Sequence, residues 1–398
     1  MNSKLNIGLF GFGVVGRGLY DVIKHVQTTR IEISKIVVKD RFKKRLIDSD
    51  IFSFCHNDIL HDDNINLVVE LIDNPTESYK IVSSALKNGK NVVSGNKKMI
   101  AENLPELIQL QKTFNVSLLY DASACGSIPV IRNLEEYYDN DLLTKITGIL
   151  NGSSNYILSS LFNSSQIYSE ALKEAQEKGF AESNPTFDVD GFDSLYKLVI
   201  LTLHGFGVYI NPSDIFRIGI SNINNKDIEY AKEKGCKIKL VGEVYKISKD
   251  QLSLYVIPRL VNQSKYIYNV EQEYNGVVIK GEFYDKQFMF GKGAGGNPTG
   301  SAVLSDITAL SYNYKYEYKK LEYFNPPVYN TNNYLVIYLR YSDINELKHF
   351  NFTEIYEKHN GNSFNYVTGK IKLSSLIAIK DIIPSLDVFI ALTNNNYE

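Results

Sequence analysis

Short runs of β-branched and other apolar residues alternate with amphipathic segments in the first third of the chain. The apolar runs predict strands at residues 6–10, 36–38, 67–71, 91–93 and 117–120. Between two of these strands, apolar residues recur at helical spacing from Thr76 to Gly89, which predicts a crossover helix that ends on the glycine. Strands that alternate with helices are typical of a parallel, doubly wound sheet, so we expect an α/β fold here.

The pattern changes at about Pro129. Helix-rich sequence comes first, and longer alternating strands at residues 237–244 and 252–257 follow it, which predicts a separate α+β unit. A proline-containing linker is expected at residues 325–327. Beyond the linker we expect, in order, a strand at 334–339, a helix around 352–359 and three further strands that end at residue 392.

These changes divide the chain into three expected domains. The first covers residues 1–130 and is completed by residues 295–320, the second covers residues 131–294, and the third is a small α+β domain at residues 330–398. More than one folding unit is also expected from the length of 398 residues, because single cores stop growing at roughly 250–300 residues.

Composition and charge narrow the range of partners. Charged residues make up 22% of the chain and the formal net charge is -2, which argues against nucleic acid and anionic membranes and favours a small-molecule substrate. No apolar run reaches ~18 residues and the start of the chain lacks a signal-peptide pattern, so we expect a cytoplasmic protein. The three scattered cysteines predict reduced thiols rather than a disulfide framework or a Cys-x-x-Cys metal site.

A glycine-rich loop follows the first predicted strand directly and opens a predicted helix. Its sequence is Gly11-Phe12-Gly13-Val14-Val15-Gly16. Gly11 permits a tight turn, Gly13 lets the backbone approach a pyrophosphate, and Gly16 allows the helix to pack closely on the strand. A bound phosphate would then lie at the helix amino terminus. The alternative is an incidental glycine-rich turn, but the strand before the loop and the helix after it favour dinucleotide binding.

Charged residues at the end of the second predicted strand bear on the choice of cofactor. Asp40 would hold the ribose hydroxyls of NAD, whereas Lys39 and Arg41 would hold the additional phosphate of NADP. Both chemistries are present, and a solvated basic turn is a further alternative. We favour NADP, because two cations flank the site.

An acid and a lysine at helical spacing are the main catalytic candidates. A helix is predicted to begin near Asp193, four residues before Lys197, so the two side chains would share one helix face. Reduction of an aldehyde needs a proton as the hydride arrives, and a partly desolvated ammonium group that an acid holds in place is a suitable donor. Taken alone, the pair would be interpreted as a surface salt bridge worth about 0.3–0.5 kcal/mol.

The sequence before this lysine is rich in acidic residues. They are Glu182, Asp188, Asp190 and Asp193. Such a cluster suits a substrate that carries an ammonium group, and it favours the catalytic interpretation of the neighbouring lysine. A divalent-metal site and a solvated acidic loop are the alternatives.

The stretch from Glu182 to Lys197 resembles the most diagnostic motif of homoserine dehydrogenase, and the resemblance covers at least residues 5–312. Five further segments match that family in the same order: residues 11–16, 94–101, 121–129, 148–158 and 293–299. The resemblance implies a Rossmann-type doubly wound parallel sheet and an α+β domain for substrate binding and dimerisation. It also implies the NAD(P)-dependent interconversion of L-aspartate 4-semialdehyde and L-homoserine in threonine, methionine and isoleucine biosynthesis.

The same resemblance implies roles for individual residues. Lys197 would be the proton donor, with Asp193 orienting it, and Lys97 would face the nicotinamide and the substrate aldehyde as a second cation. Glu182 and Asp188 would receive the α-ammonium group of the substrate. The expected cofactor-binding residues are Gly11, Phe12, Gly13, Val14, Val15, Gly16, Lys39, Arg41, Ser94, Lys97 and Gly295.

In the family, backbone carbonyls also hold a monovalent cation, Na+ or K+. The matching positions in this sequence are Asp121, Ala124, Gly126 and Ile128. Three positions depart from the family pattern: Asn184 and Asp121 stand where Asp and Glu are usual, and Cys125 replaces a small residue without a thiol. The carboxylate missing at Asn184 predicts lower substrate affinity rather than loss of activity.

The last domain resembles, more faintly, the ACT module that binds regulatory amino acids. The turn after its first strand, residues 341–348, lacks the short glycine-containing sequence that normally binds the effector. A structural or dimerising module therefore stands beside a threonine sensor as an alternative. The long amphipathic strands of the second domain suggest pairing across a two-fold axis, so we expect a homodimer or a higher homo-oligomer.

Two other functions stay open on the sequence alone. A catalytically silent regulatory paralogue would bind nucleotide or amino acid without chemistry, which the change at Asn184 motivates. A related dehydrogenase would act on a different small amino or hydroxy acid, and Glu182 and Asp188 favour a substrate with an ammonium group.

Overall fold

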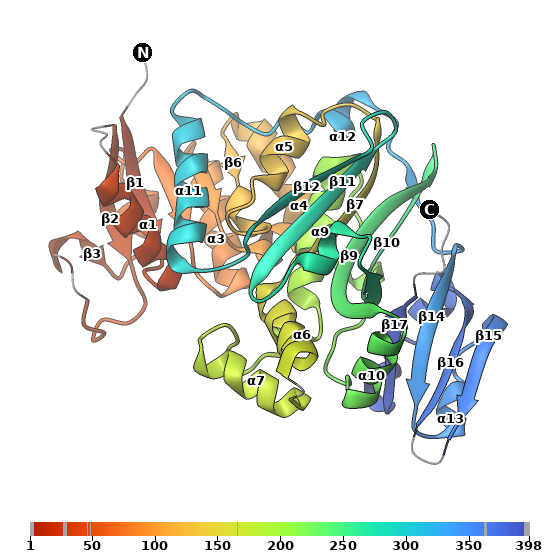
Figure 1. The fold of residues 1–398 in the computed structure, drawn as a ribbon. Helices are drawn as coiled ribbons and strands as arrows, with labels where there is room; N and C mark the ends of the chain where they lie inside the picture. Colours follow the sequence, from red (N-terminus) through yellow and green to blue (C-terminus); the bar gives the residue numbers. More distant parts are fainter. Residues whose placement is uncertain are drawn as a thin grey trace. The chain divides into compact units, whose positions relative to one another are not determined.

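The computed structural model describes residues 4–26, 30–45, 47, 49–164, 166–361 and 364–393. The chain forms two compact units (Figure 1). Unit 1 consists of residues 1–139 and 292–319, and unit 2 consists of residues 140–291 and 320–398. Each unit therefore contains two separate stretches of sequence.

Unit 1 is built around a parallel sheet. Within the described residues the sheet has six strands in the order β3-β2-β1-β4-β5-β6. The strand order reverses between β1 and β4, and dinucleotides bind at such a switch point, outside the carboxyl ends of the strands. The predicted doubly wound parallel sheet is confirmed. Its elements are β1 (Leu5–Phe10), α1 (Val14–His25), β2 (Ile31–Val37), β3 (Phe52–Ser53), α2 (Asn57–Leu60), β4 (Leu67–Glu70), α3 (Pro75–Lys87), β5 (Asn91–Ser94), α4 (Lys97–Phe114), β6 (Leu118–Leu119) and α5 (Val130–Glu136).

A helix from a distant part of the sequence completes unit 1. Helix α11 (Gly296–Leu310) packs on α1 so closely that a Cβ atom on Gly18 would lie 2.2 Å from the carbonyl oxygen of Gly296. A Cβ atom on Gly300 would lie 2.6 Å from the backbone nitrogen of Leu19. Glycine at positions 18 and 300 is what allows the two helices to meet.

Unit 2 combines helices with a long mixed sheet. Its elements before residue 292 are β7 (Leu143–Ile149), α6 (Gly152–Ser164), α7 (Tyr168–Glu177), α8 (Thr186–Val189), α9 (Phe192–Phe206), β8 (Phe216–Arg217), α10 (Asn225–Glu233), β9 (Cys236–Ser248), β10 (Gln251–Asn262), β11 (Tyr274–Gly281) and β12 (Lys286–Lys292). Those after residue 318 are α12 (Lys319–Tyr323), β13 (Val328–Tyr329), β14 (Tyr334–Tyr341), α13 (Ile344–Leu347), β15 (Phe352–Asn360), β16 (Asn365–Lys372), α14 (Leu373–Ala378) and β17 (Val388–Leu392).

The sheet of unit 2 has eleven strands among the described residues. Nine follow the order β12-β11-β7-β9-β10-β17-β14-β16-β15, and β8 and β13 pair with β10. Helix α9 lies against one face of this sheet, since a Cβ atom on Gly242 would lie within 4 Å of Leu198. Almost every residue of α9 is buried, which explains its largely apolar sequence.

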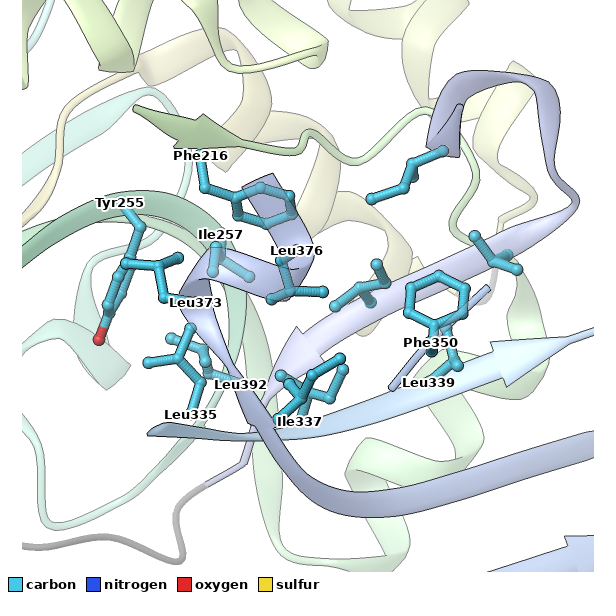
Figure 2. Close-up of a cluster of buried hydrophobic side chains, with 14 of the residues drawn as sticks. Phe216, Tyr255, Ile257, Leu335, Ile337, Leu339, Phe350, Leu373, Leu376 and Leu392 are labelled. Atoms are coloured by element: carbon cyan, nitrogen blue, oxygen red, sulfur yellow. The ribbon is translucent and has the colours of Figure 1, made fainter. Parts of the chain in front are cut away.

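The strands near the end of the chain continue this sheet and share its core. Strand β17 pairs with β10 through Leu392 and Arg259, and β14, β16 and β15 follow outward. Figure 2 shows the apolar cluster in which Ile257 of β10 lies with Leu335 of β14 and Leu376 of α14. In chain order, this part of unit 2 is β-α-β-β-α-β.

The helix predicted around residues 352–359 is wrong, because these residues form strand β15. Phe352, Ile355 and Tyr356 have helical spacing, but β15 is an edge strand whose register with β16 shifts twice. These irregularities interrupt the alternation that normally marks a strand. Within the described residues, two strands rather than three follow β15, and residues 373–378 form helix α14.

Candidate active site

The glycine-rich loop of unit 1 joins β1 to α1. Gly11 has φ +93°, and a Cβ atom there would lie 2.6 Å from the carbonyl oxygen of Leu71. A Cβ atom on Gly16 would lie 2.3 Å from the carbonyl oxygen of Gly11, so Gly16 allows close packing against the loop itself. At Gly13, which caps α1, a Cβ atom would meet nothing within 4 Å. This open space before a helix amino terminus fits a pyrophosphate group.

The other residues of the loop differ in their surroundings. The ring of Phe12 packs edge-to-face against Tyr20 and Phe52, with ring centroids 5.8 and 5.5 Å away. Val14 is 74% exposed and Val15 is half-buried. The loop is therefore anchored by Phe12 and presents Val14 to the surroundings.

The three charged residues directly after β2, Lys39, Asp40 and Arg41, are exposed. Asp40 folds back on its own turn, because its Oδ1 accepts hydrogen bonds from the backbone nitrogens of Phe42 and Lys43 at 2.8 and 3.2 Å. The guanidinium group of Arg41 lies 4.9 Å from the ring centroid of Phe54, a cation–π distance. The carboxylate of Asp40 thus shapes this turn, whereas Arg41 and Lys39 expose positive charge.

Ser94 and Lys97 lie where β5 ends and α4 begins. The buried Ser94 hydroxyl donates to Glu70 Oε2 at 2.6 Å and accepts from the backbone nitrogen of Asn96 at 3.2 Å. The side chain of Asn96 caps α4 by accepting from the backbone nitrogen of Met99 at 3.0 Å. Lys97 is the first residue of this capped helix and is half-buried.

Glu70 is the buried carboxylate behind this turn. Its Oε1 accepts from the backbone nitrogen of Ile72 at 2.7 Å, while its Oε2 receives the Ser94 hydroxyl. Burial raises the pKa of Glu70 above its usual value, although these donors oppose the change. Sequence reasoning did not single out Glu70, because only the fold shows that this strand residue is wholly enclosed.

The expected cation segment forms a tight turn in unit 1. The carbonyl oxygen of Asp121 accepts from the backbone nitrogen of Ala124 at 3.1 Å, and that of Ile128 accepts from the backbone nitrogen of Val130 at 2.8 Å. Gly126 has φ +60°, and a Cβ atom there would lie 2.5 Å from the carbonyl oxygen of Gly293. A carbonyl oxygen has two lone pairs, so an oxygen with one hydrogen bond can still coordinate a cation. Coordination of a cation by all four carbonyls, including that of Ala124, stays a prediction.

Asp121 is part of a second buried cluster that sequence reasoning missed. Its Oδ1 accepts from the backbone nitrogens of Ile131 and Arg132, and its own nitrogen donates to Asp306 Oδ2 at 2.9 Å. Asp306 Oδ1 lies 3.0 Å from Arg132 Nη2. Burial and the neighbouring Asp121 charge raise the pKa of Asp306 to about 7, although Arg132 opposes this. Gly295, with φ +121°, caps the helix that carries Asp306.

In unit 2, Asp193 and Lys197 form a buried ion pair on α9. Lys197 Nζ lies 2.7 Å from Asp193 Oδ2 and donates to the carbonyl oxygen of Leu150, also at 2.7 Å. The side chain of Lys197 is 7% exposed and that of Asp193 is 2% exposed, so this is not the surface salt bridge that the pair alone would indicate. The ammonium group is held from two sides in a fixed direction.

Asn151 connects this pair to the acidic segment before it. Its Nδ2 donates to Asp188 Oδ1 at 2.7 Å and to Asp193 Oδ2 at 2.9 Å. Asp188, Asp193 and Lys197 are therefore brought together around one amide group. Asn151 lies in the segment 148–158, which matches the family, but nothing in the sequence of that segment indicated that the Asn151 amide would lie between two carboxylates.

The remaining acidic residues are placed differently. Glu182 is exposed, and its backbone carbonyl accepts from Gln176 Nε2 at 2.9 Å. The carboxylate of Asp190 accepts a hydrogen bond from the Ser221 hydroxyl. Asn184 Oδ1 accepts from the hydroxyl of Thr186 at 2.8 Å, at the start of α8. Of the residues expected to bind the substrate, Asp188 is thus linked to the catalytic candidates, through Asn151.

A buried asparagine is a further residue that sequence reasoning missed. Asn275 is fully buried, and its Nδ2 donates at 3.0 Å to the same Leu150 carbonyl that holds Lys197. Its Oδ1 has no hydrogen-bond partner in the described parts of the chain. Asn275 therefore helps to fix the carbonyl that directs the ammonium group.

The predicted site residues are divided between the two units. The residues expected to bind the cofactor and the cation belong to unit 1, as does Lys97, whereas Glu182, Asp188, Asp193 and Lys197 belong to unit 2. No group of three or more His, Cys, Asp or Glu side chains that could hold a metal ion occurs in the described ranges. In those same ranges, no helix combines the length and apolar character needed to cross a membrane.

Comparison with known proteins gives consistent matches. The family model "Homoserine dehydrogenase" matches residues 129–308, and "Homoserine dehydrogenase, NAD binding domain" matches residues 11–121. Homoserine dehydrogenase of Bacillus subtilis is 33% identical over 78% of this chain and 74% of its own length. The Helicobacter pylori enzyme is 36% identical over 78% of this chain and 75% of its own length.

Solved structures extend the similarity to the whole fold. A homoserine dehydrogenase from Thiobacillus denitrificans has a TM-score of 0.84 at 26% identity, and the alignment covers 98% of both chains. A hyperthermophilic archaeal homoserine dehydrogenase mutant in complex with NADPH has a TM-score of 0.67 at 25% identity, covering 79% of this chain and 99% of the archaeal chain.

Proposed function

The chain belongs to the homoserine dehydrogenase family, and on that premise we propose that Lys197 is its proton donor. It is an NAD(P)-dependent oxidoreductase that interconverts L-aspartate 4-semialdehyde and L-homoserine, and the family acts in threonine and methionine biosynthesis. The observation that carries the proposal is the buried ammonium group of Lys197, held by Asp193 and the Leu150 carbonyl.

The role of Lys197 follows from what the reaction requires. When bound, the nicotinamide cofactor supplies the hydride. The carbonyl oxygen of the substrate then gains negative charge, and Lys197 delivers a proton from Nζ to that oxygen. In the oxidation of homoserine, the neutral amine of Lys197 removes the hydroxyl proton. Asp193 keeps Nζ in one direction, and Asn151 in turn fixes the Asp193 carboxylate.

We propose that the glycine-rich loop and the charges after β2 bind the cofactor, with NADP preferred. The open space at Gly13 supports a pyrophosphate at the start of α1. Exposed Lys39 and Arg41 suit the additional phosphate of NADP. Asp40, which NAD would need as a ribose acceptor, already accepts two backbone hydrogen bonds with its Oδ1. Ser94, Lys97 and Gly295 complete the proposed cofactor set.

We propose that Asp188 and Glu182 receive the α-ammonium group of the substrate. Support comes from Asp188, whose carboxylate is linked through Asn151 to the Asp193–Lys197 pair. Asn184 is neutral and accepts locally from Thr186, so it contributes no charge to this group. Substrate affinity should therefore be lower than with aspartate at that position.

Three further proposals concern the surroundings of the site. The turn at residues 121–128 would hold Na+ or K+ through the carbonyls of Asp121, Ala124, Gly126 and Ile128. A homodimer is expected from the long strands of unit 2, and light scattering would test it. We propose a cytoplasmic location, which suits the cysteine thiols of this chain.

Replacing Lys197 tests the proposal directly. Lys197→Ala, and Lys197→Met to retain the buried volume, should lower kcat by about 10²–10⁴-fold, because a positioned acid–base group contributes that much. The assay follows reduced cofactor during homoserine oxidation, with NAD and NADP in parallel. NADPH binding, measured by fluorescence titration, should persist because the glycine-rich loop belongs to unit 1.

Lys173→Ala serves as the matched control, since the Lys173 side chain is 76% exposed. Its turnover should equal that of the wild type. Near-normal turnover in Lys197→Met would remove Lys197 from the mechanism. Absence of turnover with homoserine in the wild type would instead favour the silent paralogue.

A further inference from the structure

Asn275 is a buried polar residue that has no part in the chemical step proposed above. It lies in β11 and is 0% exposed. Its Nδ2 donates to the Leu150 carbonyl at 3.0 Å, while its Oδ1 has no hydrogen-bond partner among the described residues. A buried polar atom without a partner lowers the stability of a fold, so its presence needs an explanation. Stability alone does not explain why an asparagine stands here.

The backbone around Asn275 is held in place from two sides. Gly276, the next residue, pairs with Ile149 at the end of β7. The preceding residue, Tyr274, accepts a hydrogen bond at its carbonyl oxygen from Asn155 Nδ2 of α6, at 3.2 Å. The position of Asn275 is therefore fixed by its neighbours in the chain, and its side chain does not depend on its own hydrogen bond to stay there.

The ammonium group of Lys197 has three N–H donors. In the described part of the chain, one is directed at Asp193 Oδ2 and one at the Leu150 carbonyl oxygen, each at 2.7 Å. The third is then available to the substrate oxygen, and its direction follows from the positions of the other two partners. A change in the orientation of the Leu150 carbonyl would therefore turn the donor that the reaction uses.

Each of these two partners is itself held by an amide group. Asn151 Nδ2 donates to Asp193 Oδ2 at 2.9 Å. Asn275 Nδ2 donates to the Leu150 carbonyl at 3.0 Å. The carbonyl therefore has a second donor besides Lys197, and it keeps that donor when the charge on the lysine changes during proton transfer.

We propose that Asn275 is a positioning residue for proton transfer by Lys197, an inference that rests on the proposed role of this lysine. Asn275 fixes the Leu150 carbonyl, and the carbonyl fixes the direction of the N–H that protonates the substrate oxygen. Because Asn275 is fully buried, it acts through Lys197 rather than on the substrate. The need for its Nδ2 explains why a less stabilising amide is present instead of an apolar side chain.

Replacing Asn275 should lower turnover without weakening binding. Asn275→Ala removes the donor, and Asn275→Leu removes it while filling the space, so that the test does not depend on the folding of one variant. In homoserine oxidation, kcat should fall at least about 10-fold, because a misdirected proton acceptor is used less often. The KM values for homoserine and NADP should change less than about 2-fold, as expected when an interaction that matters only in the transition state is lost.

A double-mutant cycle shows whether Asn275 acts through the lysine. In the Lys197→Met background, Asn275→Ala should change kcat by less than about 2-fold, because the group that it positions is gone. The solvent deuterium isotope effect on kcat is a second readout. It should be larger in Asn275→Ala than in the wild type, because slower proton transfer then limits turnover more than product release does.

Val277→Ala is the matched control. Val277 is also 0% exposed, and it lies two residues further along β11, on the same face of the sheet as Asn275. The change removes buried volume without removing a donor from the Leu150 carbonyl. It should lower Tm, but at a temperature where the variant is folded its kcat and its isotope effect should equal those of the wild type.

Two results would overturn the proposal. One is a kcat in Asn275→Ala and Asn275→Leu that equals the kcat of Val277→Ala. The other is a loss of kcat on Asn275→Ala that is as large in the Lys197→Met background as in the wild type, because the role of Asn275 would then be purely structural. Near-normal turnover in Lys197→Met alone would instead reject the proposed function, and this inference with it, so the two failures are distinguishable.

Discussion

Removing the Ser94 hydroxyl should both destabilise unit 1 and loosen the turn between β5 and α4. In Ser94→Ala, Glu70 loses its donor at 2.6 Å and the backbone nitrogen of Asn96 loses its acceptor at 3.2 Å. Leaving a buried polar group without its partner costs about 1–3 kcal/mol, so the two losses together cost about 3 kcal/mol. For a unit of this size, that corresponds to a fall in Tm of about 6–12 °C.

The functional effect should accompany the loss of stability. Asn96 caps the helix that begins at Lys97, so a looser turn lets the proposed second cation move. We expect a higher KM for NADPH and a lower kcat at a temperature where the variant is folded. Thermal unfolding and turnover are measured side by side on Ser94→Ala and on Ser301→Ala, an exposed change on α11. A fall in unfolding free energy below about 0.5 kcal/mol, the size of an ordinary surface change, would refute the reasoning.

Two other predictions concern unit 1. Gly13→Ala should leave Tm unchanged, because a Cβ atom meets nothing there, but should weaken NADPH binding in a fluorescence titration; equal affinity would contradict the proposed pyrophosphate position. Glu70→Gln should change the pH dependence of unfolding in urea. Since burial raises the folded-state pKa of Glu70, this group contributes stability at low pH that is lost as pH rises through that value. The variant should therefore lose less stability than the wild type as pH rises above 4.5, the ordinary pKa of this group, and parallel curves would count against a buried, titrating Glu70.

Much of the fold was predictable because it follows from local pattern. The apolar runs of the first third and the glycine-rich loop identified the parallel sheet of unit 1. The edge strand β15 was missed for a physical reason: its partner covers one side, most of its residues are exposed, and two register shifts interrupt its alternation. Helical spacing of Phe352, Ile355 and Tyr356 then suggested the wrong element.

The candidate site was predictable only in part. Asp193 and Lys197 are neighbours on a helix, so their spacing was enough to predict the pair. Asn151, Asn275 and Glu70 act through contacts with residues far away or on other strands, and no spacing within the sequence encodes such contacts. Their burial and their partners appear only when the chain is folded.

The return of the chain to unit 1 has a consequence for the order in which this protein can be made. Domains commonly fold from the amino terminus as synthesis proceeds. Here α1 gains its packing partner only when α11 has been synthesised, and unit 2 supplies the 152 residues, 140–291, that come first. A nascent chain that stops before Gly296 leaves the Gly18 side of α1 uncovered. Synthesis of unit 1 therefore starts before that of unit 2, but unit 1 cannot complete its folding until residues 140–291 of unit 2 have been made.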